Sequence, residues 1–167
     1  MEETGVNIRT ARPEDIEQIR QNIRLTLANP EGRSQRKKYE DAILRGEMMV
    51  LTRTDTKTRT DKIDAFIEWH TKIDGVVTIR DAGAIGDEPN PNVIRWLVRE
   101  LLRMVRPPTA GVKVIADQAP WNSVFEGLPG FTLEGREFSR PHWRNIWSWD
   151  GTLEPEDGRQ GRLRRRR

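Results

Sequence analysis

The stretch from Val76 to Ala116 constrains the fold most, because it holds a strand, a helix and a second strand in close succession. Val76–Ile85 and Val112–Ala116 are short runs rich in β-branched residues, and they predict strands. Between them, Pro91–Val105 has the periodicity of an amphipathic helix that Asn90 caps and that Pro107-Pro108 ends. This order predicts an α/β fold class. The apolar stripe of the helix comprises Val93, Ile94, Leu97, Val98, Leu101, Leu102 and Val105.

A β-hairpin is predicted directly before that helix. Ile63–Thr71 and Val76–Ile85 are joined through Asp74-Gly75, a dipeptide that is typical of two-residue hairpin turns. A tight turn fixes the register and sets Glu68 directly opposite Asp81. One face of the predicted hairpin then carries Phe66, Glu68, His70, Ile79 and Asp81, with His70 facing Ile79 and Phe66 facing Gly83.

The rest of the chain predicts further short elements around this centre. Pro13 and the acids after it suit the start of a helix, and isoleucines at helical spacing extend it to Leu27. Ser34 suits the cap of a second helix, which Gly46 ends. The predicted elements are strands at Val6–Thr10, Met48–Arg53, Phe131–Phe138 and Trp143–Trp149, and helices at Pro13–Leu27, Ser34–Arg45 and Trp121–Leu128.

Composition excludes several classes of protein. The chain has no cysteine and only two histidines, His70 and His142, so neither a disulfide framework nor a zinc site is expected, and no metal is predicted. It has no apolar run near the ~20 residues that a membrane helix needs. Met1–Thr4 lacks the pattern of a signal peptide, which favours a cytoplasmic setting.

The net charge of +3 comes from the C-terminal segment. From Gly151 onward the chain holds six arginines and three acids, so residues 1–150 carry equal numbers of basic and acidic side chains. We expect one domain over residues 1–150 and a disordered, arginine-rich tail over residues 151–167. Arg164–Arg167 either contact a nucleic acid or a protein partner, or keep the chain soluble.

The order of elements resembles the GNAT N-acetyltransferase superfamily. The opening Ile8-Arg9-x-Ala11-x-Pro13-Glu14-Asp15 is similar to the start of that fold, as is Asn122 followed by Gly130-Phe131. The resemblance covers residues 6–149 and implies a mixed, mostly antiparallel central sheet with helices on both faces.

The resemblance also implies an activity, namely acyl-CoA-dependent N-acetylation of an amine on a small molecule or a protein. In such a site Glu68 or Asp81 would be the general base, with His70 close by. Acetyl-CoA would be the cofactor, and its diphosphate would lie at the opening of a helix. The residues predicted to hold acetyl-CoA are Ala82, Gly83, Ala84, Gly86, Asn90 and Asn122.

The sequence departs from the family pattern in two places, which leaves a second interpretation open. The loop Gly86–Asn90 lacks an arginine and contains the acidic residues Asp87 and Glu88, which repel a diphosphate. Phe125 stands where family members often have a tyrosine acid, and the only tyrosine is Tyr39. The alternative is a catalytically inactive GNAT-fold structural or assembly protein of the phage virion type, located in the virion.

Under that alternative, the tryptophan-rich end of the chain and Arg164–Arg167 bind protein or nucleic-acid partners. Trp121, Trp143, Trp147 and Trp149 are predicted to serve in core or interface packing. A base-stacking platform is disfavoured, because no basic residues alternate with these tryptophans along the chain.

Overall fold

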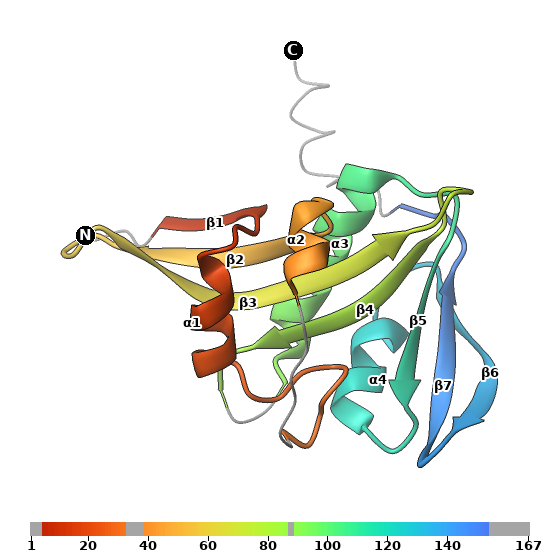
Figure 1. Cartoon of the computed structure of the whole chain (residues 1–167). Helices are drawn as coiled ribbons and strands as arrows, with labels where there is room; N and C mark the ends of the chain where they lie inside the picture. Colours follow the sequence, from red (N-terminus) through yellow and green to blue (C-terminus); the bar gives the residue numbers. More distant parts are fainter. Residues whose placement is uncertain (1–4, 33–38, 87–88, 154–167) are drawn as a thin grey trace, which may run out of the picture.

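The computed structural model describes residues 5–32, 39–86 and 89–153. Within them a single seven-stranded sheet has the order β1-β2-β3-β4-β5-β7-β6 (Figure 1). All neighbouring strands are antiparallel except β4 and β5, which are parallel. The strands are β1 (Gly5–Thr10), β2 (Met48–Asp55), β3 (Thr60–Thr71), β4 (Val77–Ala84), β5 (Ala110–Ile115), β6 (Phe131–Ser139) and β7 (His142–Trp149).

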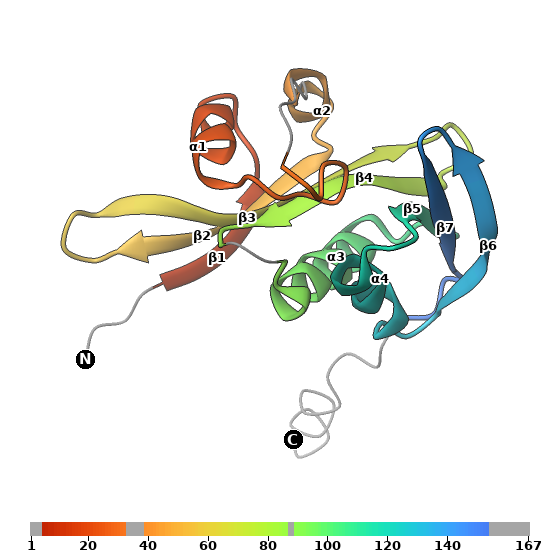
Figure 2. The ribbon, with the colours of Figure 1, turned by 90° about the horizontal axis from the view of Figure 1, so that it is seen from below.

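Helices cover both faces of the sheet, as Figure 2 shows. The helices α1 (Asp15–Asn22) and α2 (Glu40–Leu44) lie on one face, and α3 (Pro91–Val105) and α4 (Ala119–Glu126) lie on the other. The predicted fold class, a mixed and mostly antiparallel sheet between helices, is confirmed.

Two apolar cores correspond to the two layers. The larger one lies between the sheet and α3, and includes Leu97, Leu101 and Trp121. The smaller one lies beneath α1 and α2, and includes Ile19, Met48 and Phe66. Alternation along the central strands sends successive residues to opposite cores, so β2 and β3 are buried on both faces.

Helix α3 begins and ends at the predicted residues. The Asn90 side chain accepts a hydrogen bond from the Val93 N–H at 3.3 Å, and Pro91 occupies the first helical position, where no N–H is needed. At the other end Arg106 adopts the left-handed conformation, with φ of 52°, and the two prolines that follow stop the helix.

The β3–β4 hairpin corrects one part of the predicted register. Its turn is longer than predicted, since the Lys72 N–H donates to the Val76 carbonyl and Gly75 has φ of +88°. Arg80 is then an extra residue in β4, a β-bulge that offsets the longer turn. Glu68 therefore pairs with Asp81 as predicted, whereas Ile79 pairs with Trp69 and His70 pairs with Thr78.

The predicted first helix is too long. Helix α1 ends at Asn22, and the chain then runs extended across the sheet instead of continuing to Leu27 as a helix. Thr26 forms an antiparallel bridge with Gly83, and the Leu27 N–H donates to the Ala82 carbonyl at 2.8 Å. Backbone pairing with β4 outweighs the helical spacing of the apolar residues. The second helix is also shorter than predicted, and its predicted cap, Ser34, lies outside the described residues.

Strands β4 and β5 part soon after they meet. They pair over three positions, from Val77 with Ala110 to Ile79 with Val112. Beyond these pairs β4 continues to Ala84 and β5 to Ile115, and the two strands point in different directions (Figure 1). The opening between them lies at the carboxyl ends of two parallel strands.

No helix in the described ranges is both long and apolar enough to cross a membrane. The predicted tail, including Arg164–Arg167, falls outside the described residues from position 154 onward.

The crossing of the α1–α2 connection over β4 requires a glycine at position 83. A Cβ atom there would lie 2.8 Å from Ile23 Cγ2 and 3.0 Å from Phe66 Cε1. We expect Gly83→Ala to lower the free energy of unfolding by about 1–3 kcal/mol, measured by urea denaturation. Gly135→Ala is the matched control, because a Cβ atom at Gly135 has no neighbour within 4 Å. Equal stabilities of the two variants would contradict this account of the crossing.

Candidate functional site

Two buried carboxylates lie side by side on the sheet face that α1 and α2 cover. Glu68 on β3 pairs with Asp81 on β4, and their exposed fractions are 4% and 1%. Carboxylates in such a position are costly unless hydrogen bonds or cations compensate them. This pair is therefore the first place to look for chemistry, and its neighbours decide what each member does.

Asp81 holds the α1–α2 connection and the start of α2 against the sheet. Its Oδ1 accepts hydrogen bonds from the backbone N–H groups of Ala28, at 2.9 Å, and Ala82, at 3.0 Å. Its Oδ2 accepts a hydrogen bond from the Tyr39 hydroxyl at 3.0 Å. Three segments that are distant in sequence thus meet at one carboxylate.

Tyr39, the only tyrosine, falls within the predicted second helix, and no function was predicted for it from the sequence. It lies directly before α2, is buried, and packs edge-on against Phe66 with ring centroids 5.3 Å apart. Burial, followed by the charges of Asp81 and Glu68, raises the pKa of the Tyr39 hydroxyl well above its usual value. Tyr39 is therefore a hydrogen-bond donor at neutral pH. Its contact with Asp81 spans 42 positions, so no local spacing could have indicated it.

His70 has a different carboxylate as its partner. Its Nδ1 lies 3.3 Å from Glu47 Oε1, and Glu47 also accepts hydrogen bonds from Arg45 and from the Thr71 N–H. Burial alone would raise the pKa of Glu47, but its bonds to Arg45, Thr71 and His70 together hold that pKa below its usual value. His70 thus belongs to a partly exposed ion-pair group beside the buried carboxylates.

The predicted cofactor residues of β4 are already engaged within the chain. The Ala82 N–H donates to Asp81, and the Ala82 carbonyl accepts from Leu27. Gly83 packs closely against Ile23 and Phe66, and Ala84 ends the strand in a buried position. Gly86, at φ of +112°, is the exposed member of this group.

The opening of α3 is formed by Asn90, Pro91 and Asn92. The Asn90 side chain accepts a hydrogen bond from the Val93 N–H. The Asn92 N–H lies in the same first turn, at the positive end of the helix dipole. Arg95, on the first turns of the same helix, is the basic residue nearest to this opening along α3. Its guanidinium donates hydrogen bonds to the carbonyls of Ser123 and Val124 and to Asn92 Oδ1. The predicted repulsion by Asp87 and Glu88 concerns positions outside the described residues.

Asn122 is a structural connector in this fold. Its amide nitrogen donates to the carbonyls of Ile115, at 3.1 Å, and Gln118, at 2.9 Å. Its oxygen accepts from Asn145 and from the Trp147 indole, at 2.8 and 2.9 Å. An amide offers two donor hydrogens and two acceptor positions, so these bonds use its capacity within the chain.

Two further predictions concern residues near α4 and metal ligands. Phe125 is buried against Phe131, with ring centroids 5.3 Å apart, and serves in the core. In the part of the chain that the structure describes, no group of three or more His, Asp or Glu side chains could hold a metal ion.

The fold defined by this sheet, its parting strands and its four described helices is that of the GNAT acetyltransferases. The ribosomal-protein-S18-alanine N-acetyltransferase from Escherichia coli matches with a TM-score of 0.65 at 15% identity, over 92% of this chain and 98% of that one. A GNAT-family acetyltransferase from Bacillus cereus matches with a TM-score of 0.67 at 13% identity, over 87% of this chain and 97% of that one. The chain is a GNAT-fold protein.

A third neighbour was solved with its cofactor. It is described as an acetyltransferase from Salmonella typhimurium with acetyl-CoA, and it matches with a TM-score of 0.60 at 13% identity, over 90% of this chain and 96% of that one. No protein-family model and no curated protein sequence matches the chain. At these identities the likeness establishes the fold, and the site must be argued from its own geometry.

The chain has a single tyrosine, so ionisation of Tyr39 can be followed by absorbance without interference from another phenol. A free tyrosine ionises near pH ~10. Because the pKa of Tyr39 is raised, we expect no tyrosinate absorbance in the folded protein at that pH, and a single rise that coincides with alkaline unfolding. Protonated Tyr39 contributes to the free energy of unfolding. This contribution is complete below the unfolded-state pKa of about 10 and is lost as pH rises above it. A separate midpoint near pH ~10, with unchanged near-UV circular dichroism, would contradict the described burial of Tyr39.

Proposed function

We propose that this protein is an acyl-CoA-dependent N-acyltransferase. The parting of β4 and β5 after three paired positions carries the proposal, because it creates an opening at the carboxyl ends of two parallel strands, beside the start of α3. The three neighbours named above are described as acetyltransferases, and one of these three was solved with acetyl-CoA.

The described residues fit acetyl-CoA well at one end of this opening. The first turn of α3 offers the Asn92 N–H and the positive end of a fifteen-residue helix dipole, which suit a diphosphate. Gly86 allows close approach of another group to the backbone. The fit is limited at Ala82, whose backbone groups are both hydrogen-bonded within the chain. When bound, the cofactor would supply an acyl group as a thioester.

Glu68 is the proposed general base. Asp81 is committed to the Ala28 and Ala82 N–H groups and to Tyr39, and Tyr39 remains protonated at neutral pH. Glu68 shares the sheet face of Asp81 and lies directly opposite it, and in the proposed reaction its carboxylate accepts a proton from the amine. In this scheme Asp81 and Tyr39 position the loop and strand around Glu68.

The proposed acceptor is an amine on a small molecule or a protein. Structural neighbours are described with acceptors of both classes. The Escherichia coli enzyme is described as acting on an alanine of a ribosomal protein, and a Vibrio cholerae chimera is described as a spermidine N-acetyltransferase.

A second candidate function is a GNAT-fold binding protein without chemistry. The observation that favours it is the hydrogen bond from Leu27 to Ala82, because the chain itself pairs with the edge of β4 that borders the opening. The virion-assembly interpretation of the sequence gains no support from the three neighbours from Escherichia coli, Bacillus cereus and Salmonella typhimurium, which are acetyltransferases.

Acetyl-CoA is expected to raise the melting temperature of the protein. A ligand at ~100 times its dissociation constant adds about 2.7 kcal/mol, which corresponds to a rise of about 5–10 °C for a chain of this size. Differential scanning fluorimetry with millimolar acetyl-CoA measures the shift. Absence of any shift would reject the acyltransferase proposal and leave the binding-protein candidate.

A charge variant locates that effect at the start of α3. Asn92→Glu adds a negative charge in the first turn, which stabilises the helix itself and repels a diphosphate. We expect it to abolish the shift that acetyl-CoA causes. Thr132→Glu, on an exposed position of β6, is the matched control and should retain the shift.

Removing the proposed base should abolish turnover while binding persists. With an accepted amine in hand, Glu68→Gln is expected to lower kcat by a factor of about 100 or more, measured by release of the free thiol of CoA. Glu134→Gln on β6 is the matched carboxylate-to-amide control. Unchanged kcat in Glu68→Gln would remove Glu68 from the mechanism without affecting the proposed binding of acetyl-CoA.

A further inference from the structure

Two aromatic side chains lie together on the surface at the far end of the β6–β7 hairpin. Phe138 and Trp143 are paired across the two strands, with ring centroids 5.4 Å apart and an angle of 61° between the planes. Their exposed fractions are 56% and 54%, whereas Trp121, Trp147 and Trp149 are buried. The pair therefore contributes little to the core, and its ring surface is open to solvent.

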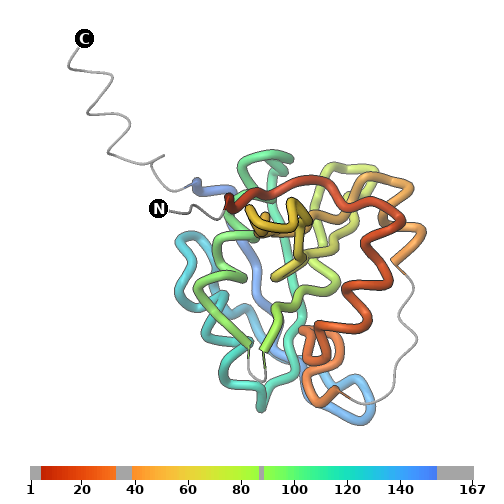
Figure 3. Tube along the Cα trace, turned by 90° about the vertical axis from the view of Figure 1, so that its left-hand side faces the viewer, coloured from red at the N-terminus to blue at the C-terminus, as the bar shows by residue number. Residues whose placement is uncertain are grey.

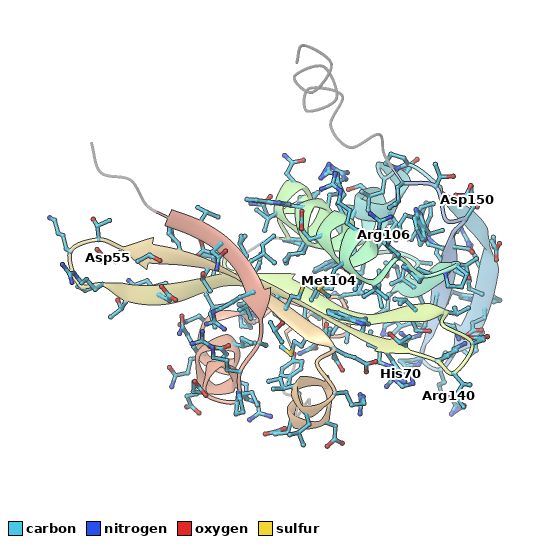
Figure 4. The ribbon with its side chains drawn as sticks, turned by 90° about the horizontal axis from the view of Figure 1, so that it is seen from above. Asp55, His70, Met104, Arg106, Arg140 and Asp150 are labelled. Carbon is cyan, nitrogen blue, oxygen red and sulfur yellow. The ribbon has the colours of Figure 1, made fainter. Side chains whose placement is uncertain are left out.

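Two arginines flank this aromatic pair along β6. Arg136 lies two residues before Phe138, and Arg140 begins the turn two residues after it. Both are exposed, and neither side chain forms a hydrogen bond or an ion pair with any residue in the described ranges. Figure 4 shows Arg140 at the outer end of the sheet, directed away from the body of the protein.

The hairpin is open on its outer side. β6 is the last strand of the sheet, so within the described residues nothing pairs with its outer edge (Figure 2). Helix α4 reaches the hairpin through Asn122, which contacts Asn145 and Trp147, positions further along β7 than Trp143. A ligand that follows β6 would therefore meet Arg136, Phe138 with Trp143, and Arg140 in succession.

The spacing of this row fits an extended polyanion with planar groups. Alternate residues of a strand are about 6.7 Å apart, so Arg136 stands about that far from Phe138, and Arg140 follows in the turn on the other side of the aromatic pair. Single-stranded nucleic acid presents phosphates and bases at comparable intervals, and it is bound elsewhere by cations that follow the backbone and rings that stack on bases.

We propose that the surface formed by Arg136, Phe138, Arg140 and Trp143 binds single-stranded nucleic acid. The arginines contact phosphates, and the exposed rings stack on bases. Recognition is largely independent of sequence, because every base offers a stacking face.

A lipid surface is a poorer match for the same side chains. Binding to a lipid surface buries apolar side chains at the boundary with the acyl chains, so such side chains must reach that boundary ahead of polar ones. Here the tip is Ser139-Arg140-Pro141-His142, which is polar, and the aromatic rings lie behind it. Insertion would bury Arg140 before either ring.

The test measures the affinity of the full chain for a fluorescently labelled single strand of about a dozen nucleotides by anisotropy over a range of salt concentrations. Phe138→Ala and Trp143→Ala are each expected to weaken binding about 5- to 100-fold. Arg136→Gln and Arg140→Gln are each expected to reduce the slope of log affinity against log salt by about 0.7. The same sequence as a duplex should bind more weakly than the single strand.

The controls separate this surface from other sources of binding. Every variant keeps residues 154–167, so any contribution from Arg164–Arg167 is the same in all of them. Arg12→Gln removes an exposed arginine from the distant β1–α1 turn and should leave affinity and salt slope unchanged. Melting temperatures of the variants should equal that of the original chain, because all four side chains are exposed.

Two results would overturn the proposal. One is equal affinity of the original chain and the Phe138→Ala and Trp143→Ala variants for the single strand. The other is binding of phosphatidylserine-containing vesicles that Trp143→Ala abolishes, without binding of the oligonucleotide, which would assign the surface to lipid.

Discussion

The carboxylate of Asp81 joins parts of the chain that are distant in sequence. It accepts hydrogen bonds from a backbone N–H of the α1–α2 connection, from the backbone of its own strand and from the Tyr39 hydroxyl. A buried carboxylate is stable only with such donors around it, and the donors in turn are fixed in place by it. This one group holds the connection on its path and the Tyr39 hydroxyl in the core, and Glu68 lies opposite it on β3.

The same arrangement shapes the opening between β4 and β5. Because Asp81 anchors Ala28, the residues just before it lie along β4, where Leu27 bonds to Ala82 and the close crossing requires Gly83. On the side of the opening formed by β4, the α1–α2 connection therefore occupies the backbone edge of the strand. The side formed by the start of α3 keeps a helix N–H and the helix dipole available for an anion. Both proposed functions begin from this asymmetry.

Much of the fold could be predicted from the sequence, because local signals agree with it. Asn90, Pro91 and the prolines after Arg106 define α3 by capping and termination, which are properties of adjacent residues. The pairing of Glu68 with Asp81 was also predicted, although the turn is longer than expected and a bulge at Arg80 compensates for it. The end of α1 was missed because long-range pairing with β4 competes with helical periodicity.

The partners of the candidate site residues were less accessible to sequence reasoning. Tyr39 and Asp81 are 42 positions apart, and the saturation of Asn122 depends on residues of β5 and β7 that only the fold brings close. The surface around Trp143 shows the same limit. The spacing of the tryptophans along β7 gives no sign of flanking cations, yet Arg136 and Arg140 stand beside Trp143 on the neighbouring strand.

Arg95 has a mechanical consequence. Its guanidinium ties the mouth of α3 to the last carbonyls of α4, and α4 is joined through Asn122 to β5 and β7. One flank of the molecule is thus braced as a unit, while the flank of α1 and α2 is braced separately at Asp81 (Figure 3). Between these two flanks the strands β4 and β5 pair over only three positions, so the packing of α3 against β3 and β4 carries much of the remaining connection between them.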